Sequence, residues 1–323
     1  MVKKRVLSGI RATGRLHIGN YFGAVKGMIE LQDSPEYETF YMVADVHTIT
    51  TPYNVDELRK NRREVVIDYL AAGLDPRKSV IFLQSDVAEH MELALYFSSV
   101  VTIARMQHLP TYKDKIKQYP KDNTMALLNY PVLMAADILA YKAGLVPVGV
   151  DQDPHLEVAR EIARKMNEKY GTDFPEPQRF KTKGEYVPSL KGEGKMSKSV
   201  EGSYISFNDP PVEIYRKVKS IPTATQAGGE MNQGVNALFT LGQLFIPTQM
   251  DAFKHEFDKG TLQFSHLKDA IAHGISQELR PIQERRAQIS EVDVDRVIKE
   301  GAAKARETAR ETVNQVKKAM GLS

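Results

Sequence analysis

Residues 5–20 read RVLSGIRATGRLHIGN, and this stretch decides the fold. Its first six residues form a short apolar run that is typical of a buried strand. Gly14 then permits a tight turn, and we expect a helix to start near His17 to Asn20. In an open α/β sheet, ligands bind beside the carboxyl ends of the strands. The turn that follows this first strand is therefore a candidate ligand site.

Further apolar runs alternate with longer, helix-like segments through the first two thirds of the chain. We expect strands at 39–46, 79–86 and 145–151, and helices at 20–32, 55–73 and 125–144. This alternation predicts an α/β fold: a Rossmann-like doubly wound parallel sheet with a second, smaller all-helical C-terminal domain.

The domain boundary is expected near residue 205, because no strand-like run follows it. Residues 1–205 form the predicted Rossmann-like domain, and the NDPP sequence at 208–211 marks the joint to a helical domain at 206–300. The glycine-rich segment 226–234 is expected to be a loop. At the C-terminus, small and apolar residues recur at steps of three and four, which predicts an amphipathic helix over about 302–321 that packs back on the first domain.

Composition excludes several classes of protein. The chain has no cysteine, so disulfides, thiolate nucleophiles, iron–sulfur clusters and thiolate zinc sites are excluded, and the eight histidines show no zinc-ligand spacing. No apolar run approaches the roughly 20 residues that a membrane helix needs, so we expect a soluble, cytoplasmic protein. The formal charge of +3 is too small to indicate nucleic-acid binding by itself. A polyanion would have to meet a local patch of positive charge.

The first turn carries polar side chains suited to an anion. His17 and Asn20 are three residues apart, so on a helical turn they project from one face and can donate to the same bound group. Gly19 has no side chain, which lets a flat ring approach the backbone. Taken alone, the segment is equally consistent with an ordinary strand-to-helix turn that a histidine caps.

A second cluster, KGEGKMSKS at 191–199, places two lysines and two serines behind a pair of glycines. The ammonium groups of Lys195 and Lys198 could neutralise a leaving pyrophosphate, and Ser197 and Ser199 add hydroxyl donors. A short Lys/Ser cluster taken alone is more often a solvated basic loop.

The two clusters together, HIGN at 17–20 and KMSKS at 195–199, resemble the signature motifs of class I aminoacyl-tRNA synthetases. The resemblance implies that the lysine loop, with Met196 among its residues, grips the phosphates of ATP while an amino acid is activated. ATP is then a substrate, accompanied by Mg²⁺, and the catalytic groups are Lys195, Lys198, Asn20 and Lys115.

A lone acid in an apolar helix points to the amino acid. Asp137 lies in YPVLMAADIL (130–139), and a buried carboxylate is costly unless it meets a donor. An indole N–H is one such donor, with Met134 and Ile138 against the ring; an internal salt bridge or cap is the alternative. YPVLMAADIL and the GVDQ turn at 149–152 resemble the substrate-binding segments of tryptophanyl-tRNA synthetases, and the similarity extends over nearly the whole chain.

That resemblance implies particular roles for individual residues. It assigns Asp137 to the indole nitrogen, Tyr130 and Gln152 to the α-amino group, and Gly149, Val150 and Asp151 to the ribose; it puts Val187 against adenine, makes Lys115 a further phosphate-binding lysine, and lines the ATP site with Arg11, Ala12, Thr13, His17, Gly19 and Asn20. His47 either edges the amino-acid pocket or is a satisfied strand-end histidine. L-Tryptophan, tRNA(Trp) and a second copy of the chain are the implied partners.

Three positions depart from the commoner family pattern: Asn20 replaces a histidine, Arg11 stands where glutamine is frequent, and Leu7 where phenylalanine often packs on the substrate. The last two leave the shape of the pocket open. A tyrosine-specific relative, a small-molecule nucleotidyltransferase and a non-catalytic paralogue remain alternative interpretations. In the helical part, Arg280, Arg285 and Arg286 are candidate RNA contacts, with a solvated helix face as the alternative.

Overall fold

The computed structural model describes residues 3–181, 186–192, 194–198, 200–223 and 231–323. Its centre is a five-stranded, fully parallel sheet in the order β3-β2-β1-β4-β5. The strands are β1 (Lys4–Arg11), β2 (Tyr37–Ala44), β3 (Ser79–Leu83), β4 (Leu145–Pro147) and β5 (Gln178–Phe180). The predicted doubly wound sheet is confirmed, although the short β5 was not predicted.

Alternate residues of the strands enter two different cores. Val6, Tyr41 and Val43 pack on one face with α2 (Lys26–Asp33) and α4 (Val55–Ala72). Leu7 and Phe40 pack on the other face with α5 (Glu89–Ser98), α8 (Met125–Ala140) and α9 (Asp153–Tyr170). This period of two is what a sheet covered by helices on both faces requires.

The helices that surround the sheet follow the strands in chain order, and together with the sheet they form the first unit of the structure. A continuous helical run after β1 consists of α1 (Ile18–Asn20), the π-helical η1 (Tyr21–Val25) and α2 (Lys26–Asp33). The others are α3 (Asp45–Thr48), α4 (Val55–Ala72), η2 (Gln84–Asp86), α5 (Glu89–Ser98), α6 (Ile103–Gln107), α7 (Pro110–Gln118), α8 (Met125–Ala140), η3 (Val150–Gln152) and α9 (Asp153–Tyr170).

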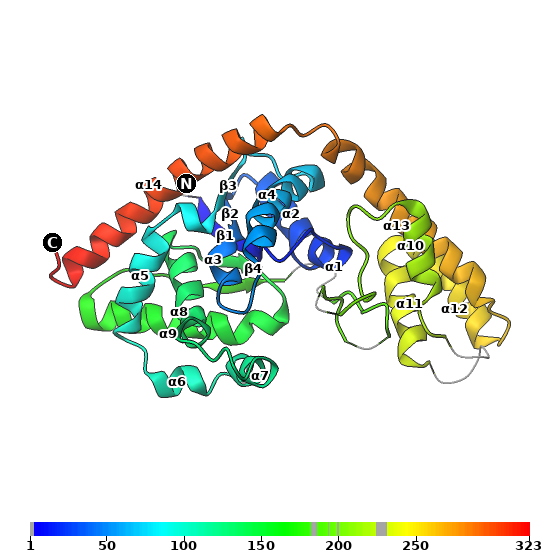
Figure 1. Cartoon of the computed structure of the whole chain (residues 1–323), viewed down its shortest axis with the longest axis horizontal. Helices are drawn as coiled ribbons and strands as arrows, with labels where there is room; N and C mark the ends of the chain where they lie inside the picture. The colour runs from blue at the N-terminus through cyan, green and yellow to red at the C-terminus, as the bar shows by residue number, and fades with distance from the viewer. Residues whose placement is uncertain (1–2, 182–185, 193, 199, 224–230) are drawn as a thin grey trace.

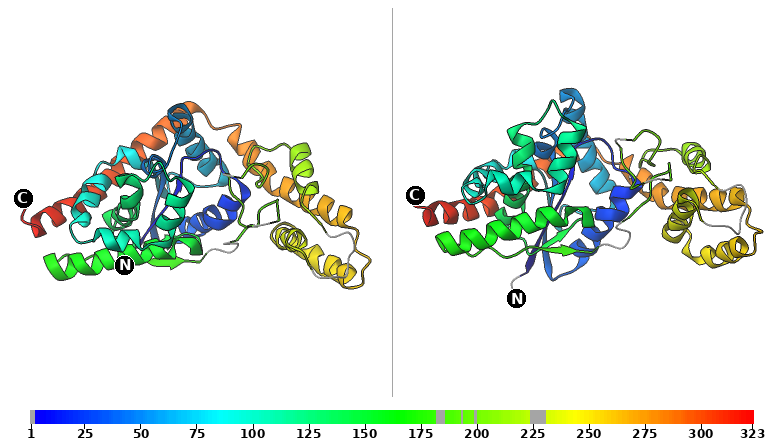
Figure 2. Two further views of the ribbon diagram at one scale, coloured as in Figure 1. Left: turned by 60° about the horizontal axis from the view of Figure 1, so that its bottom comes forward. Right: turned by 90° about the horizontal axis from the view of Figure 1, so that it is seen from below.

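A helical unit lies to one side of the sheet (Figures 1 and 2). It contains α10 (Pro211–Lys219), α11 (Gln233–Phe245), η4 (Pro247–Gln249), α12 (Met250–Asp258) and the long α13 (Phe264–Arg286). Helix α13 packs against α10 and α11 and also contacts α4 of the first unit. Of the glycine-rich segment 226–234 that was expected as a loop, residues 226–230 lie outside the described residues, and the last two residues, Gln233 and Gly234, are not loop but begin α11.

The last helix, α14 (Glu291–Ala319), crosses from the helical unit over the first unit (Figure 1). It begins at Glu291 rather than near residue 302, because Ser290 caps it by accepting from the backbone N–H of Asp293. Residues 291–300, which the sequence assigns to the helical domain at 206–300, are therefore part of this helix. Gly301 allows its close packing on β3, since a Cβ there would lie 1.8 Å from the carbonyl oxygen of Ile81.

None of the helices among the described residues is both long and apolar enough to span a membrane.

Candidate active site

The candidate site lies where the chain reverses direction across the sheet. From β1 the chain builds outward through β2 and β3, and it then returns to add β4 and β5 on the other side of β1. In doubly wound sheets, the crevice at such a switch point is where ligands bind. The polar segments predicted from the sequence follow β1, β2 and β4 and so meet at this edge.

The turn after β1 is held in one conformation by its own side chains. Gly14 has φ of 120°, a value that favours glycine. His17 Nδ1 accepts from the backbone N–H of Asn20, and Asn20 Oδ1 accepts from the backbone N–H of His17. Because Nδ1 accepts, the proton of the neutral imidazole lies on Nε2. His17 and Asn20 thus keep an imidazole N–H and an amide NH₂ as donors for a ligand.

Burial keeps this imidazole neutral. His17 is only 6% exposed, and burial together with the charges of Lys198 and Lys195 lowers its pKa to about 3. The two lysines of the distant loop therefore act electrostatically on the turn. The structure brings the two predicted motifs into one site.

Direct bonds also join the lysine loop to the turn. Lys198 Nζ donates to the carbonyl oxygen of Gly14 at 2.8 Å. The loop is anchored beneath by Met196, whose N–H donates to the carbonyl oxygen of Val187. Val187 and Met196 are buried in the core, and Ser203 Oγ contacts the carbonyl oxygen of Ser197. Ser199 lies outside the described residues.

Burial also sets the charge state of Lys198. It lowers the pKa of the ammonium to about 8, although the charge of Asp68 opposes the shift. An ammonium that has lost its water and has few compensating partners gains most from a nearby anion.

The turn after β4 contacts Lys195, the second lysine of the loop at 191–199. Lys195 Nζ lies 3.3 Å from Asp151 Oδ1, and a Cβ on Gly149 would lie 2.5 Å from the same oxygen. A side chain at position 149 would therefore make the carboxylate of Asp151 move. Val150, which lies between Gly149 and Asp151 in the sequence, is exposed. Lys195 is held by a carboxylate in this structure and can exchange that partner for phosphate.

Asp137 is fully buried and bonded on both oxygens. Oδ1 lies 2.8 Å from Gln84 Nε2 and 2.7 Å from His90 Nδ1, and Oδ2 lies 2.7 Å from His47 Nε2. Burial alone would raise the pKa of Asp137, but the charges and hydrogen bonds of His47 and His90 outweigh it and lower the pKa. His90 also contacts the Tyr141 hydroxyl at 2.6 Å.

For Asp137 and for His47, the sequence left two interpretations open, and the hydrogen bonds of this network bear on both. Asp137 makes the internal contacts that were one alternative, while the described residues leave Oδ2 with a single partner, His47. His47 is both a satisfied histidine at a strand end and a neighbour of Tyr130, whose ring centroid lies 6.4 Å from its own. Ile138 is buried, and Met134 is half-buried beside it. Gln84 and His90 were missed, because nothing in sequence links them to a helix some 50 residues later.

A histidine that sequence reasoning missed joins the residues assigned to the α-amino group. His155 Nε2 lies 2.7 Å from the Tyr130 hydroxyl, and Nδ1 lies 3.1 Å from Gln152 Oε1. Gln152 Nε2 in turn donates to Asp151 Oδ2 at 2.8 Å. The available signal was the spacing of three residues between Gln152 and His155 where α9 begins.

Arg11 ends β1 and points a partly satisfied guanidinium into this region. One terminal nitrogen donates to Thr51 Oγ1 at 2.8 Å, whereas the buried Nε has no partner among the described residues. Burial lowers the pKa of Arg11, and burial and then Arg11 lower the pKa of Lys115. Lys115 therefore lies on the Arg11 side of the site. Of the next two residues, Ala12 is buried and Thr13 is exposed.

The arginines expected at an RNA surface have other roles at the C-terminal end of α13. Arg286 is ion-paired with Glu64 and with Asp68, and Arg285 Nε donates to the carbonyl oxygen of Ala71 at 2.6 Å. Both side chains join α13 to α4, while Arg285 is still exposed, so their contact with RNA stays a prediction. Arg280 remains exposed and pairs with Glu284 one turn later.

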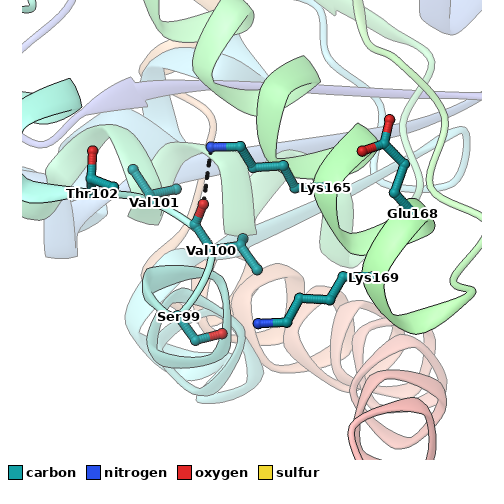
Figure 3. Close-up of a pocket in the computed structure, with 7 residues that line it drawn as sticks. All are labelled: Ser99, Val100, Val101, Thr102, Lys165, Glu168 and Lys169. Atoms are coloured by element: carbon teal, nitrogen blue, oxygen red, sulfur yellow. Dashed lines mark hydrogen bonds between the residues drawn. The ribbon is translucent and has the colours of Figure 1, made fainter.

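An open hollow of about 420 Å³ lies elsewhere, between the end of α5 and helix α9. Figure 3 shows its lining residues, among them Lys165, whose Nζ donates to the carbonyl oxygen of Val100 at 3.2 Å. None of the predicted site residues lines it. It is therefore not part of the candidate active site.

The site thus has two chemically different ends. One end presents ammonium groups and neutral N–H donors, which suit phosphates. The other presents a buried carboxylate that is bonded to Gln84, His90 and His47, and its remaining lone pair suits an uncharged N–H donor on a ring. Between them lie a tyrosine hydroxyl and a glutamine amide held by His155.

Comparison with known proteins agrees with this arrangement. Residues 2–279 match the family described as tRNA synthetases class I (W and Y), so the chain belongs to that family of class I tRNA synthetases. It is 39% identical to a tryptophan–tRNA ligase from Treponema pallidum, over 99% of this chain and 97% of that protein.

Solved structures give the same result. The structure of tryptophanyl-tRNA synthetase from Mycoplasma pneumoniae superimposes with a TM-score of 0.88 at 31% identity, covering 100% of this chain and 99% of that one. The Campylobacter jejuni enzyme, complexed with ADP and tryptophan, gives 0.84 at 31% identity and covers 98% of this chain and 100% of that one.

Proposed function

We propose that this protein is a tryptophan–tRNA ligase, which activates L-tryptophan with ATP and then transfers it to tRNA(Trp). The observation that carries the proposal is that two features occur together in the site. One is a buried acid, Asp137, and the other is a lysine loop that is bonded to the turn after β1. The names and full-length similarity of the bacterial relatives support it further.

In the first step, the carboxylate of tryptophan attacks the α-phosphate of ATP and releases pyrophosphate. No protein nucleophile is needed, so catalysis consists of alignment and stabilisation of charge. Lys195 and Lys198 neutralise the departing phosphates, and the Nε2–H of His17 and the amide of Asn20 donate to phosphate oxygens. Arg11 and Lys115 are further cations of the site.

Mg²⁺ fits this site as an ion that enters with ATP. The described side chains assigned to the phosphates are cations or neutral N–H donors, and the nearby carboxylate of Asp151 is paired with Lys195, so the ligands of Mg²⁺ would be phosphate oxygens and water. When bound, it shares the neutralisation of charge on the pyrophosphate. The chain's own contribution is the lysines that hold that group in place.

The amino-acid end selects for a donor on a ring. We infer that the remaining lone pair on Asp137 Oδ2 accepts the indole N–H, with Met134 and Ile138 against the ring. A site built around such a bond rejects an analogue without the donor by about 10⁴ or more, because its own polar group is left unpaired. Phenylalanine is rejected on this ground, while tyrosine must be excluded by shape.

The tRNA and assembly roles belong to the same proposal. The helical unit from α10 to α13 would read the anticodon, with Arg280 among the exposed residues. A homodimer is supported by large apolar side chains exposed on three neighbouring helices: Leu95 of α5, Ile103 of α6 and Met125 of α8. Function in translation would place the protein in the cytoplasm.

The decisive experiment is ATP–pyrophosphate exchange without tRNA, with tryptophan, tyrosine and phenylalanine supplied separately. Exchange with tryptophan alone is the expected result. Exchange with tyrosine would move the protein to the tyrosine branch of the family. No exchange with any of the three would favour a nucleotidyltransferase or a non-catalytic role.

A further inference from the structure

His155 occupies the first turn of α9 and is 3% exposed. It contacts side chains from three other elements: the Tyr130 hydroxyl of α8, the Thr111 hydroxyl of α7 at 3.1 Å, and Gln152 Oε1 of η3. A buried imidazole with a polar neighbour on each nitrogen has a defined protonation pattern, which the neighbours determine.

Tyr130, His155, Gln152 and Asp151 form a series of hydrogen bonds. The carboxylate of Asp151 determines the direction of each bond in this series. Asp151 can only accept, so the nitrogen of the Gln152 amide faces it and Oε1 faces His155. Oε1 can only accept, so His155 carries its proton on Nδ1. Nε2 must then accept, and the Tyr130 hydroxyl at 2.7 Å is its nearer donor.

The imidazole stays neutral at neutral pH. Burial and the charge of His47 lower the pKa of His155 to about 4, although the charge of Asp151 opposes the shift. The donors and acceptors of this hydrogen-bonded series therefore keep the same roles at neutral pH. As a result, the Tyr130 hydroxyl gives its proton to His155 and keeps its own lone pairs as acceptors.

We propose that His155 is a positioning residue that makes Tyr130 an acceptor and aligns Gln152, and so creates the ammonium-binding end of the amino-acid pocket. The inference rests on the proposed function, since it assumes an amino-acid substrate whose α-ammonium group needs acceptors. Without the imidazole, the tyrosine hydroxyl can point its proton into the pocket and repel that ammonium.

The same series of hydrogen bonds links the amino-acid pocket to the phosphate end of the site. Asp151, which orients Gln152 through Oδ2, holds Lys195 through Oδ1. Loss of His155 frees the Gln152 amide to rotate, but it leaves the pairing of Asp151 with Lys195 in place. The effect of a His155 variant should therefore fall on the amino acid and not on ATP.

The test compares three ligands that share the indole ring. Tryptophan carries both polar groups, tryptamine keeps the ammonium, and 3-indolepropionate keeps only the carboxylate. We expect His155→Leu to weaken tryptophan and tryptamine about tenfold or more, as loss of a hydrogen bond to a charged group does. The affinity of the variant for 3-indolepropionate, measured by calorimetry, should stay within about twofold of that of the parent protein. The KM for ATP in the exchange reaction should not change.

Conservative variants separate the two arms of the imidazole. In His155→Gln the amide reaches the place of Nε2 and keeps an acceptor for Tyr130, whereas in His155→Asn the amide reaches the place of Nδ1 and keeps a donor for Gln152. We expect partial recovery of tryptamine binding in both variants, and they remain informative if His155→Leu fails to fold. His255→Leu, on the exposed face of α12, is the matched control.

Two results would overturn the proposal. Equal weakening of all three ligands would mean that His155 only supports the fold, and unchanged tryptamine binding would mean that it does not set the ammonium site. Failure of the proposed function is distinguishable, because the parent protein itself would then neither bind tryptophan nor exchange pyrophosphate with it.

Discussion

Lys198 Nζ donates to the carbonyl oxygen of Gly14 at 2.8 Å, so residues 184 positions apart in sequence close one site. The bond joins the lysine loop to the turn that ends β1. Because a backbone carbonyl is a weaker partner than a phosphate, the ammonium has more to gain from ATP than it loses on leaving Gly14. The structure thus holds the loop near the place where its charge is needed.

The charge of Lys198 should make ATP use depend on pH. Its pKa of about 8 means that the free protein loses this charge as pH rises through that value. We expect KM for ATP in the exchange reaction to rise between about pH 8 and about pH 9.5. Lys198→Arg should abolish this rise, because a guanidinium stays protonated there.

Unfolding through the same group cannot produce that rise. A lysine whose pKa is lowered on folding binds fewer protons in the folded than in the unfolded state between about pH 8 and its ordinary value of 10.5. Its contribution to the free energy of unfolding therefore increases with pH across that window. A rise in KM of equal size in the arginine variant would assign the effect to another group.

Lys195 should serve the chemistry rather than the binding of tryptophan. We expect Lys195→Ala to reduce tryptophan-dependent exchange by about 10² or more, a typical loss when one group that stabilises transition-state charge is removed. The affinity for tryptophan, measured by calorimetry, should stay within about twofold. Lys191→Ala is the control, since Lys191 is exposed in the same segment. Equal loss of exchange and tryptophan binding would contradict the role.

The sequence predicted those parts of the molecule in which neighbours along the chain decide the structure. β1, Gly14 and His17 lie within one short stretch, and apolar period, turn residue and cap all agree there. β5 was missed because Gln178, Arg179 and Phe180 form no apolar run, and only pairing with β4 makes them a strand. The start of α14 was misplaced because charged residues hide its period, although Ser290 and Asp293 form a recognisable cap.

The unpredicted features of the site depend on contacts between distant segments. Nothing local in Asp137 shows that Gln84 and His90 complete its shell, and nothing local in Arg286 shows that it meets Glu64 and Asp68. Such partners are set by the arrangement of the elements, which a single sequence does not show.

Asp137 should recognise the indole N–H. The test compares tryptophan with β-(3-benzothienyl)alanine, in which sulfur replaces the N–H with little change of shape. We expect the parent protein to prefer tryptophan by a factor on the order of 10⁴, and Asp137→Asn to lose most of that preference. Competition in the exchange reaction measures the ratio. An unchanged ratio in the variant would refute the contact, even if both affinities fell because the buried network lost its acceptor.

Arg286 should determine both stability and the position of the turn after β1. Its guanidinium bonds to Asp68 Oδ1 at 3.0 Å, and Asp68 Oδ2 accepts the backbone N–H of Leu16 at 2.7 Å, next to His17. Asp68 has no exposed surface, so Arg286→Ala leaves a buried carboxylate with one donor fewer. We expect the free energy of unfolding to fall by about 3 kcal/mol, the lower end for a broken buried pair, because Arg286 is partly exposed.

The same variant should raise KM for ATP, because the carboxylate that holds Leu16 would no longer be fixed from the side of α13. Arg280→Ala is the control on the same helix; its exposed pair with Glu284 should contribute under about 1 kcal/mol and should leave KM for ATP unchanged. Urea denaturation and the exchange assay measure the two quantities. If the two variants behave alike, Arg286 is only a surface charge. If Arg286→Ala loses stability but keeps KM, the bond to Asp68 joins the two units without positioning the turn.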